Sequence, residues 1–144
     1  SGTDVARKLV ILARETGWKL SLEELMLQPI LTDKMDPSIS INQFLDELSE
    51  FDNQMLDLFE SAKKQNMCLR YVAKCIPGQT GTVGLESIDL KSSLAQVSGT
   101  DNIIEIKTQR YFDQPLVIKG PGAGPEVTAA GVFADLIKLA QQLR

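Results

Sequence analysis

The stretch CLRYVAKCIPGQTGTVGLESI, residues 68–88, decides the fold class of this chain. Apolar and β-branched residues recur from Cys68 to Ile76 and again from Thr82 to Ile88, around a segment rich in proline and glycine at 77–81. Two such runs joined by a short glycine-containing turn predict a β-hairpin. Before residue 68 the apolar residues follow a helical period instead, so the hydrophobic pattern changes at this point.

Working outward from the hairpin, the chain predicts helices, then a run of strands, then a final helix. Helices are predicted, from apolar spacing and end signals, at Asp4–Thr16 (ended by Gly17), after Ser40 and at Asp52–Gln65. Ser21–Glu24 has the spacing of a capping box. Extended segments are expected at Leu25–Leu31 and Leu94–Val97, and loops at Thr32–Pro37 and 99–102. Further strands are predicted at Asn102–Tyr111 and Pro115–Lys119. This order predicts one α+β domain over residues 1–144, with a mostly antiparallel (mixed) sheet and helices packed on one face.

A glycine-rich loop, Gly120–Gly124, leads directly into the last predicted helix, which extends to about Leu143. Pro125 suits the first helical position, and Glu126 complements the positive end of the helix dipole. The spacing Gly-x-Gly-x-Gly differs from the dinucleotide fingerprint Gly-x-Gly-x-x-Gly. Three interpretations stay open: a sharp strand-to-helix turn, a phosphate cradle, and a loop that packs against another domain or against a cofactor held elsewhere.

Composition narrows the function classes. The chain is 43% hydrophobic with a net charge of −4, and its scattered Lys and Arg residues form no basic stripe, so no nucleic-acid partner is expected. No apolar run approaches the roughly 18 residues of a membrane span, and no membrane partner is expected. Cys68 and Cys75 lie roughly 23 Å apart along one predicted strand, too far to pair with each other. Two free thiols favour a reducing compartment, which predicts a cytoplasmic protein.

The chain contains no histidine. Ser-His and Cys-His nucleophiles and His-rich metal sites are therefore excluded, no metal is predicted, and acid–base work falls to Lys, Asp, Glu or Tyr. Asp4 and Lys8 are spaced i, i+4 on one helix face. They form either a surface ion pair or, in a dry cleft, a proton-transfer site. Arg70-Tyr71 and Arg110-Tyr111 are interpreted as residues that pack on a sheet surface.

Four separated blocks resemble, in order, landmarks of the homoserine dehydrogenases. SGTDVARKLVILARE, residues 1–15, is similar to the Ser-Gly-x-Asp-Val-x-Arg-Lys segment of that family. The other three blocks are Leu69–Val72, Pro115–Gly120 and Gly122–Ala129. The resemblance covers essentially the whole chain and is greatest to the C-terminal portion of bifunctional aspartokinase–homoserine dehydrogenases.

The resemblance implies the NAD(P)-dependent interconversion of L-homoserine and L-aspartate 4-semialdehyde, a step in threonine and methionine biosynthesis. It implies that Lys8 transfers the proton and that Asp4 belongs to the substrate site. It places Gly122, Ala123, Gly124 and Thr128 on the cofactor side of the cleft. It also implies a homodimer formed through the sheet, and a last helix that packs on a nucleotide-binding domain.

That domain, which would bind most of the NAD(P), and any aspartokinase domain are expected upstream of Ser1, so we expect the isolated chain to be an inactive catalytic and dimerisation fragment. Apolar residues on both alternating sets of the strand-rich region 68–119 also favour self-association. Two alternatives come from other classes: a non-catalytic dimerisation or small-molecule-binding regulatory module of the same fold, and a purely structural dimerisation domain.

Overall fold

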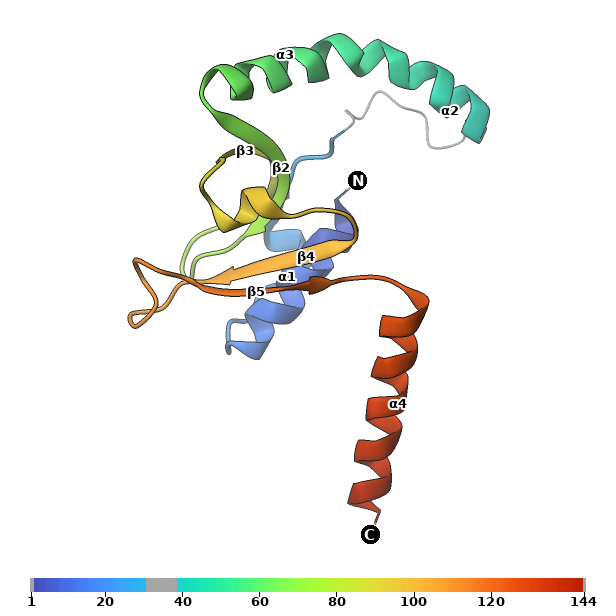
Figure 1. Cartoon of the computed structure of the whole chain (residues 1–144), viewed down its shortest axis with the longest axis vertical. Helices are drawn as coiled ribbons and strands as arrows, with labels where there is room; N and C mark the ends of the chain where they lie inside the picture. The colour runs from blue at the N-terminus through green and yellow to red at the C-terminus, as the bar shows by residue number, and fades with distance from the viewer. Residues whose placement is uncertain (1, 31–38, 144) are drawn as a thin grey trace. The chain divides into compact units, whose positions relative to one another are not determined.

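The computed structural model describes residues 2–30 and 39–143, and its contacts divide the chain into two compact units, Ser1–Leu90 (unit 1) and Lys91–Arg144 (unit 2). Figure 1 shows the order of the elements along the chain. Both units combine helices with strands, which confirms the predicted α+β class. The loop predicted at Thr32–Pro37 lies outside the described residues.

Unit 1 is built on a three-stranded mixed sheet in the order β1-β3-β2. The predicted hairpin is confirmed: β2 (Met67–Lys74) pairs antiparallel with β3 (Gly81–Asp89), from Met67 opposite Asp89 to Lys74 opposite Thr82. The short strand β1 (Leu25–Leu27) lies parallel to β3, with Leu25 opposite Gly81. The sheet therefore joins segments from both ends of the unit.

Helix α1 (Thr3–Glu15) covers this sheet with one apolar face. Ala6, Leu9, Val10 and Ala13 recur at helical spacing and are all buried. Leu20, Leu25 and Val83 complete the same core cluster. After Thr16 the chain leaves the helix at Gly17, whose φ of 86° suits glycine, as the sequence predicted. Burial of the apolar stripe thus fixes which face of α1 remains outside.

The remaining helical part of unit 1 consists of α2 (Ile41–Leu48), the 3₁₀ turn η2 (Ser49–Phe51) and α3 (Asp52–Lys64), which follow one another in Figure 1. Ser40 caps α2, since its hydroxyl accepts a hydrogen bond from the Gln43 amide at 3.3 Å. A second capping box at Ser21 begins the 3₁₀ turn η1 (Leu22–Glu24). The helix starts that the sequence predicted at Ser40 and Ser21 are therefore both confirmed.

Unit 2 contains the 3₁₀ turn η3 (Ser93–Gln96), the antiparallel pair β4 (Asp101–Ile106) and β5 (Leu116–Pro121), and the long helix α4 (Pro125–Gln142). The extended segment predicted at 94–97 is wrong, because the Ser92 hydroxyl accepts a hydrogen bond from the Leu94 amide and closes a turn. The strand predicted to reach Tyr111 ends at Ile106, since Thr108 and Tyr111 bond each other in a loop.

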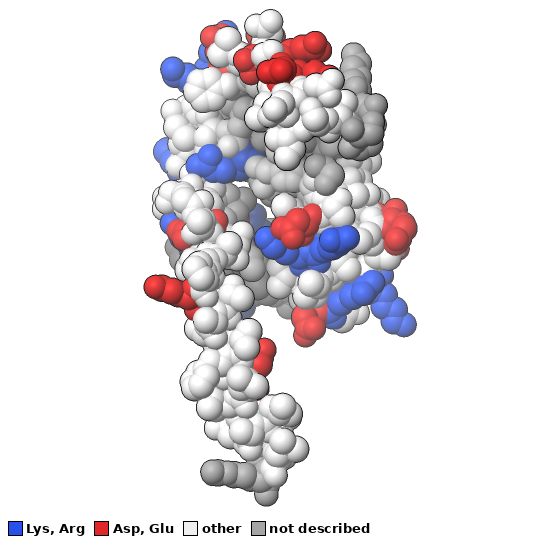
Figure 2. All heavy atoms as spheres, turned by 90° about the vertical axis from the view of Figure 1, so that its right-hand side faces the viewer, with Lys and Arg blue, Asp and Glu red and all other residues white. Residues whose placement is uncertain are grey.

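No described residue of unit 2 is buried. Exposed apolar side chains occur all along α4, and Figure 2 shows few charged groups on this helix. No helix within residues 2–30 and 39–143 is long and apolar enough to cross a membrane. The described part of unit 2 therefore lacks a fully buried core, and side-chain contacts such as the Lys119–Asp101 ion pair at 3.4 Å also join its strands.

Candidate functional site

The Asp4–Lys8 pair lies on the first two turns of α1. The Lys8 ammonium and the Asp4 carboxylate are 3.0 Å apart, and their side chains are 54% and 79% exposed. The pair faces outward because Ala6, Leu9 and Val10, on the other side of the helix, are buried in the core. Asp4 also complements the positive end of the helix dipole. The predicted spacing therefore produces a direct ion pair on an open surface.

Apolar side chains continue this outer face toward the C-terminal end of α1. Ile11 and Leu12 stand three and four residues after Lys8 and remain 60% and 39% exposed. Residues at these spacings are neighbours on a helix surface. An ion pair bordered by exposed leucine and isoleucine is suited to being covered by another surface, where reduced water contact strengthens its electrostatics.

The glycine loop of unit 2 connects β5 to α4. Gly124 is the N-cap of α4, with φ 144°, and a Cβ built on it would meet nothing within 4 Å. Gly122 differs, because a Cβ there would overlap the side-chain amide of Asn102. Its own amide donates to the Thr100 carbonyl at 2.9 Å. Gly122 thus fits the loop closely against β4, whereas Gly124 leaves open space at the helix start.

Thr128 closes the first turn of α4. Its amide and its hydroxyl both donate to the Gly124 carbonyl, at 3.0 and 2.9 Å. Pro125 has no amide hydrogen, and the amides of Glu126 and Val127 precede this first bond, where a helix offers them no acceptor. The backbone amides of Glu126 and Val127 can therefore donate to an acceptor from outside the helix, whereas the Thr128 hydroxyl already donates to the Gly124 carbonyl.

Asp4 and Lys8 belong to unit 1, whereas Gly122, Ala123, Gly124 and Thr128 belong to unit 2. The predicted site residues therefore divide between the two units. Each half is complete in its local geometry: an ion pair on a packed helix, and a glycine-capped helix start.

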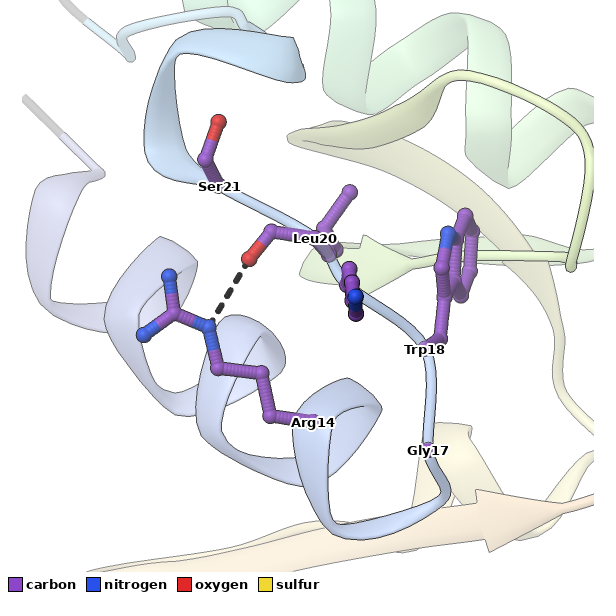
Figure 3. A pocket seen from close by; sticks show the side chains of 6 residues that line it. Arg14, Gly17, Trp18, Leu20 and Ser21 are labelled. Atoms are coloured by element: carbon purple, nitrogen blue, oxygen red, sulfur yellow. Dashed lines mark hydrogen bonds between the residues drawn. The ribbon is translucent and has the colours of Figure 1, made fainter.

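A hollow of about 550 Å³ lies at the other end of α1 and is lined by Arg14, Gly17, Trp18, Lys19, Leu20 and Ser21. Figure 3 shows the guanidinium of Arg14 donating from Nε to the Leu20 carbonyl, at 3.0 Å. Ten residues of helix separate Arg14 from Asp4, about 15 Å at the usual rise. This hollow is therefore a feature of the turn after α1 and stands apart from the Asp4–Lys8 pair.

Other candidate residues have structural roles. Cys68 and Cys75 are both free, and Cys75 packs against the core, where burial raises the pKa of its thiol. Tyr71 also packs against the core, whereas Tyr111 is exposed, so the interpretation of sheet-surface packing holds for Tyr71. No cluster of potential metal ligands occurs among residues 2–30 and 39–143.

Sequence reasoning missed one feature of the site. The start of α1 at Gly2 rests on the hydroxyl of Tyr71, which lies on β2. Only Gly2 could have been recognised from the sequence, because glycine is one of the residues favoured at a helix N-cap. No spacing rule connects it with a tyrosine far along the chain.

Together these features define an α+β chain with a lysine–carboxylate pair on the first helix of unit 1 and a glycine-capped helix in unit 2. The family model described as homoserine dehydrogenase matches residues 1–137. This chain therefore belongs to the homoserine dehydrogenase family.

Named relatives agree with this assignment. Over 141 residues the chain is 44% identical to bifunctional aspartokinase/homoserine dehydrogenase 1, chloroplastic, of Arabidopsis thaliana, with 97% of this chain and 16% of that protein covered. It is 39% identical to homoserine dehydrogenase of Saccharomyces cerevisiae, with 99% of the chain and 40% of the relative covered. A Candida auris protein of unknown function has a matching crystal structure, with TM-score 0.87, 37% identity, and 97% and 39% coverage. The chain thus spans less than half the length of these relatives.

Proposed function

We propose that the protein to which this chain belongs is an NAD(P)-dependent oxidoreductase that interconverts L-homoserine and L-aspartate 4-semialdehyde. One observation carries the assignment of roles: Lys8 and Asp4 form a 3.0 Å ion pair on the outer face of α1, in a chain of the homoserine dehydrogenase family. Lys8 is the proton-transfer residue, and Asp4 belongs to the substrate site. A surface pair with only a structural role would contribute a few tenths of a kcal/mol.

In this proposal Lys8 handles the proton of the substrate oxygen. When the aldehyde is reduced, the Lys8 ammonium donates a proton to the carbonyl oxygen as it becomes a hydroxyl. In the reverse direction the neutral amine accepts the hydroxyl proton. Asp4 orients the ammonium from one helical turn away. The sequence contains no histidine, so the base for this step is a Lys, Asp, Glu or Tyr of the chain, and the similarity to homoserine dehydrogenases favours Lys8 among them.

The nicotinamide cofactor supplies or accepts the hydride when it is bound. Gly122, Ala123, Gly124 and Thr128 are the positions of this chain that we place on the cofactor side of the cleft. The open space at Gly124 and the amides ahead of Thr128 suit contact with an electron-rich group. The Asn102 side chain occupies the space beside Gly122, and the Thr128 hydroxyl already donates to the Gly124 carbonyl. This loop therefore offers only a few contacts to a cofactor. Most of the cofactor is bound by an upstream nucleotide-binding domain.

The same proposal includes partners and compartment. A nucleotide-binding domain belongs to the longer chain, and relatives of both kinds match, the bifunctional aspartokinase/homoserine dehydrogenase of Arabidopsis and the homoserine dehydrogenase of yeast, so an aspartokinase domain stays open. Exposed Leu116, Val117 and Ile118 on β5 support a homodimer through this strand-rich part. The two free cysteines support a reducing compartment, for which we propose the cytosol.

Replacing Lys8 in the full-length protein tests the proposal. Lys8→Ala should lower kcat by roughly 10²–10⁴, the usual contribution of general acid–base catalysis. Lys64→Ala is the matched control, because Lys64 pairs with Glu60 at the same i, i+4 spacing on α3. That variant should retain wild-type kcat. The 144-residue chain alone should show no turnover.

Turnover near wild type in a folded Lys8→Ala enzyme would contradict the role of Lys8. Equal losses in Lys8→Ala and Lys64→Ala would show a general effect of removing a surface charge. Homoserine oxidation by the 144-residue chain would overturn the division of the site between this chain and an upstream domain.

A further inference from the structure

The position of the Asp4–Lys8 pair depends on where α1 begins. Gly2 is the N-cap of α1 and has φ 77°, in the left-handed region that favours glycine. Its carbonyl accepts the first backbone bond of the helix, from the Ala6 amide at 3.0 Å. Asp4 lies within this first turn and Lys8 one turn further, so a shift at Gly2 moves both side chains.

Tyr71 reaches this point from β2. A Cβ built on Gly2 would overlap the Tyr71 hydroxyl and lie 3.3 Å from the ring carbon Cε1, so the phenol lies directly against the Gly2 backbone. The hydroxyl donates a hydrogen bond to the Gln28 carbonyl at 2.9 Å. The start of α1 thus contacts the Tyr71 side chain, which is hydrogen-bonded to Gln28.

The acceptor at Gln28 is held in turn by β3. The Gln28 amide donates to the Val83 carbonyl at 2.7 Å. A Cβ at Gly84 would lie only 2.7 Å from Oε1 and 3.0 Å from Cβ of Gln28, so the absence of a side chain at Gly84 lets Gln28 lie close to the strand. The Tyr71 hydroxyl therefore links the helix start to the hydrogen-bonded sheet rather than to a loose loop.

We propose that Tyr71 is a positioning residue: its hydroxyl, bonded to the Gln28 carbonyl and in contact with Gly2, holds the first turn of α1 so that Asp4 and Lys8 meet the substrate in the correct place. This inference rests on the proposed function. Catalytic groups need support from packed neighbours, because a displacement of about 1 Å can reduce rates about a hundredfold. A phenol is protonated at neutral pH even at its ordinary pKa of 10.0, and desolvation raises the pKa of Tyr71 further, so its hydroxyl can donate to the Gln28 carbonyl.

Tyr71→Phe in the full-length enzyme tests this role, because it keeps the ring and removes only the hydroxyl. We expect kcat to fall about 10- to 100-fold while KM for homoserine changes less than about threefold. Hydrogen exchange should become faster in a peptide that covers residues 2–9 and stay unchanged in one that covers 10–16. Gly2→Ala should also lower kcat, and its loss should not multiply with that of Tyr71→Phe, since both disturb one contact.

Two controls separate positioning from general stability. Ala62→Gly weakens α3 at a buried position far along the chain from α1, and should leave kcat at the wild-type value even where it lowers Tm as much as Tyr71→Phe does. Tyr111→Phe removes the hydroxyl of the exposed tyrosine of unit 2 and should change nothing.

Wild-type kcat in Tyr71→Phe would overturn the inference. So would a kcat loss matched by Ala62→Gly at equal Tm, a rise in KM with kcat unchanged, or unchanged exchange at residues 2–9. An active Lys8→Ala enzyme would instead remove the proton-transfer role proposed for Lys8, and a full-length protein without homoserine dehydrogenase activity would remove the proposed function itself. The exchange measurement reports on the helix start whichever residue performs the chemistry.

Discussion

Helices α1 and α4 belong to the two units and differ in how they meet their surroundings. α1 buries Ala6, Leu9, Val10 and Ala13 against the sheet of unit 1. α4 is longer, yet no residue of it is buried, and its apolar side chains lie on more than one side of the helix. A helix that is apolar on most sides is normally enclosed by other protein. Unit 1 therefore has its own core, whereas α4 of unit 2 is built to be covered from outside itself.

This difference separates the two halves of the proposed site. The Asp4–Lys8 pair is attached to a packed core, so its geometry is set within unit 1. The Gly120–Gly124 loop is followed by a helix in which no residue is buried. The Asp4–Lys8 pair is thus positioned by packing within unit 1, whereas the glycine loop leads into a helix that has no buried residue.

The largest expected effect comes from the same leucine-to-alanine change made in each unit. Leu20 is 3% exposed in the core of unit 1, and Leu136 is 58% exposed on α4. In the 144-residue chain Leu20→Ala should lower the free energy of unfolding by about 2–5 kcal/mol. Leu136→Ala should change it by less than about 0.5 kcal/mol. Urea denaturation followed by circular dichroism measures both, and equal losses would remove the contrast between the units.

Glycine replacements within unit 2 should have smaller effects of opposite sign. Gly122→Ala forces the Asn102 side chain to move and should cost about 1–3 kcal/mol, as overpacking does. Gly131 lies within α4 with nothing within 4 Å of an added Cβ, so Gly131→Ala should stabilise the helix by about 0.5–1 kcal/mol. Thermal unfolding compares the two variants. A stabilising Gly122→Ala would show that Asn102 does not fill this space.

The smallest effect concerns alkaline pH and unit 1. Burial raises the pKa of the Cys75 thiol and of the Tyr71 phenol above their ordinary values of 9.0 and 10.0. In the unfolded chain these groups lose protons at lower pH than in the folded one. Their contribution to stability is therefore fully present below pH 9 and is lost as the pH rises, from 9 upward for Cys75 and from 10 upward for Tyr71, through the raised pKa of each group in the folded state. Urea midpoints should fall over this range, and less steeply in Cys75→Ala. Identical slopes for both proteins would contradict the prediction.

The sequence predicted features that depend on local patterns. Apolar spacing and end signals located α1 and α3 to within one residue at each end, and the glycine-containing turn identified the β2–β3 hairpin. The parallel pairing of β1 with β3 was not predicted, because Leu25 and Gly81 are far apart in the sequence and no local pattern connects them. The η3 turn was not predicted, because it depends on the hydrogen bond from the Leu94 amide to the Ser92 hydroxyl rather than on apolar spacing.

The candidate site was predictable to the same degree. The i, i+4 spacing placed Asp4 beside Lys8, and the ion pair is present. The contact of Tyr71 with Gly2 was not predictable, since it joins residues on different elements and depends on the tertiary packing of α1 over the sheet. Local sequence thus specified the two side chains of the ion pair, whereas long-range packing specifies which residue lies against the start of their helix.

Hydrogen exchange on the 144-residue chain tests the contrast between the units most directly. Amides of α1 near Val10 and Ala13 should be protected up to the stability of the whole unit, because exchange there requires the core to open. Amides of α4 near Phe133 and Ile137 should exchange at least about 100-fold faster, and should become protected in the full-length protein. Protection of α4 equal to that of α1 in the 144-residue chain would contradict the account, since unit 2 would then be stable without protein from outside this chain.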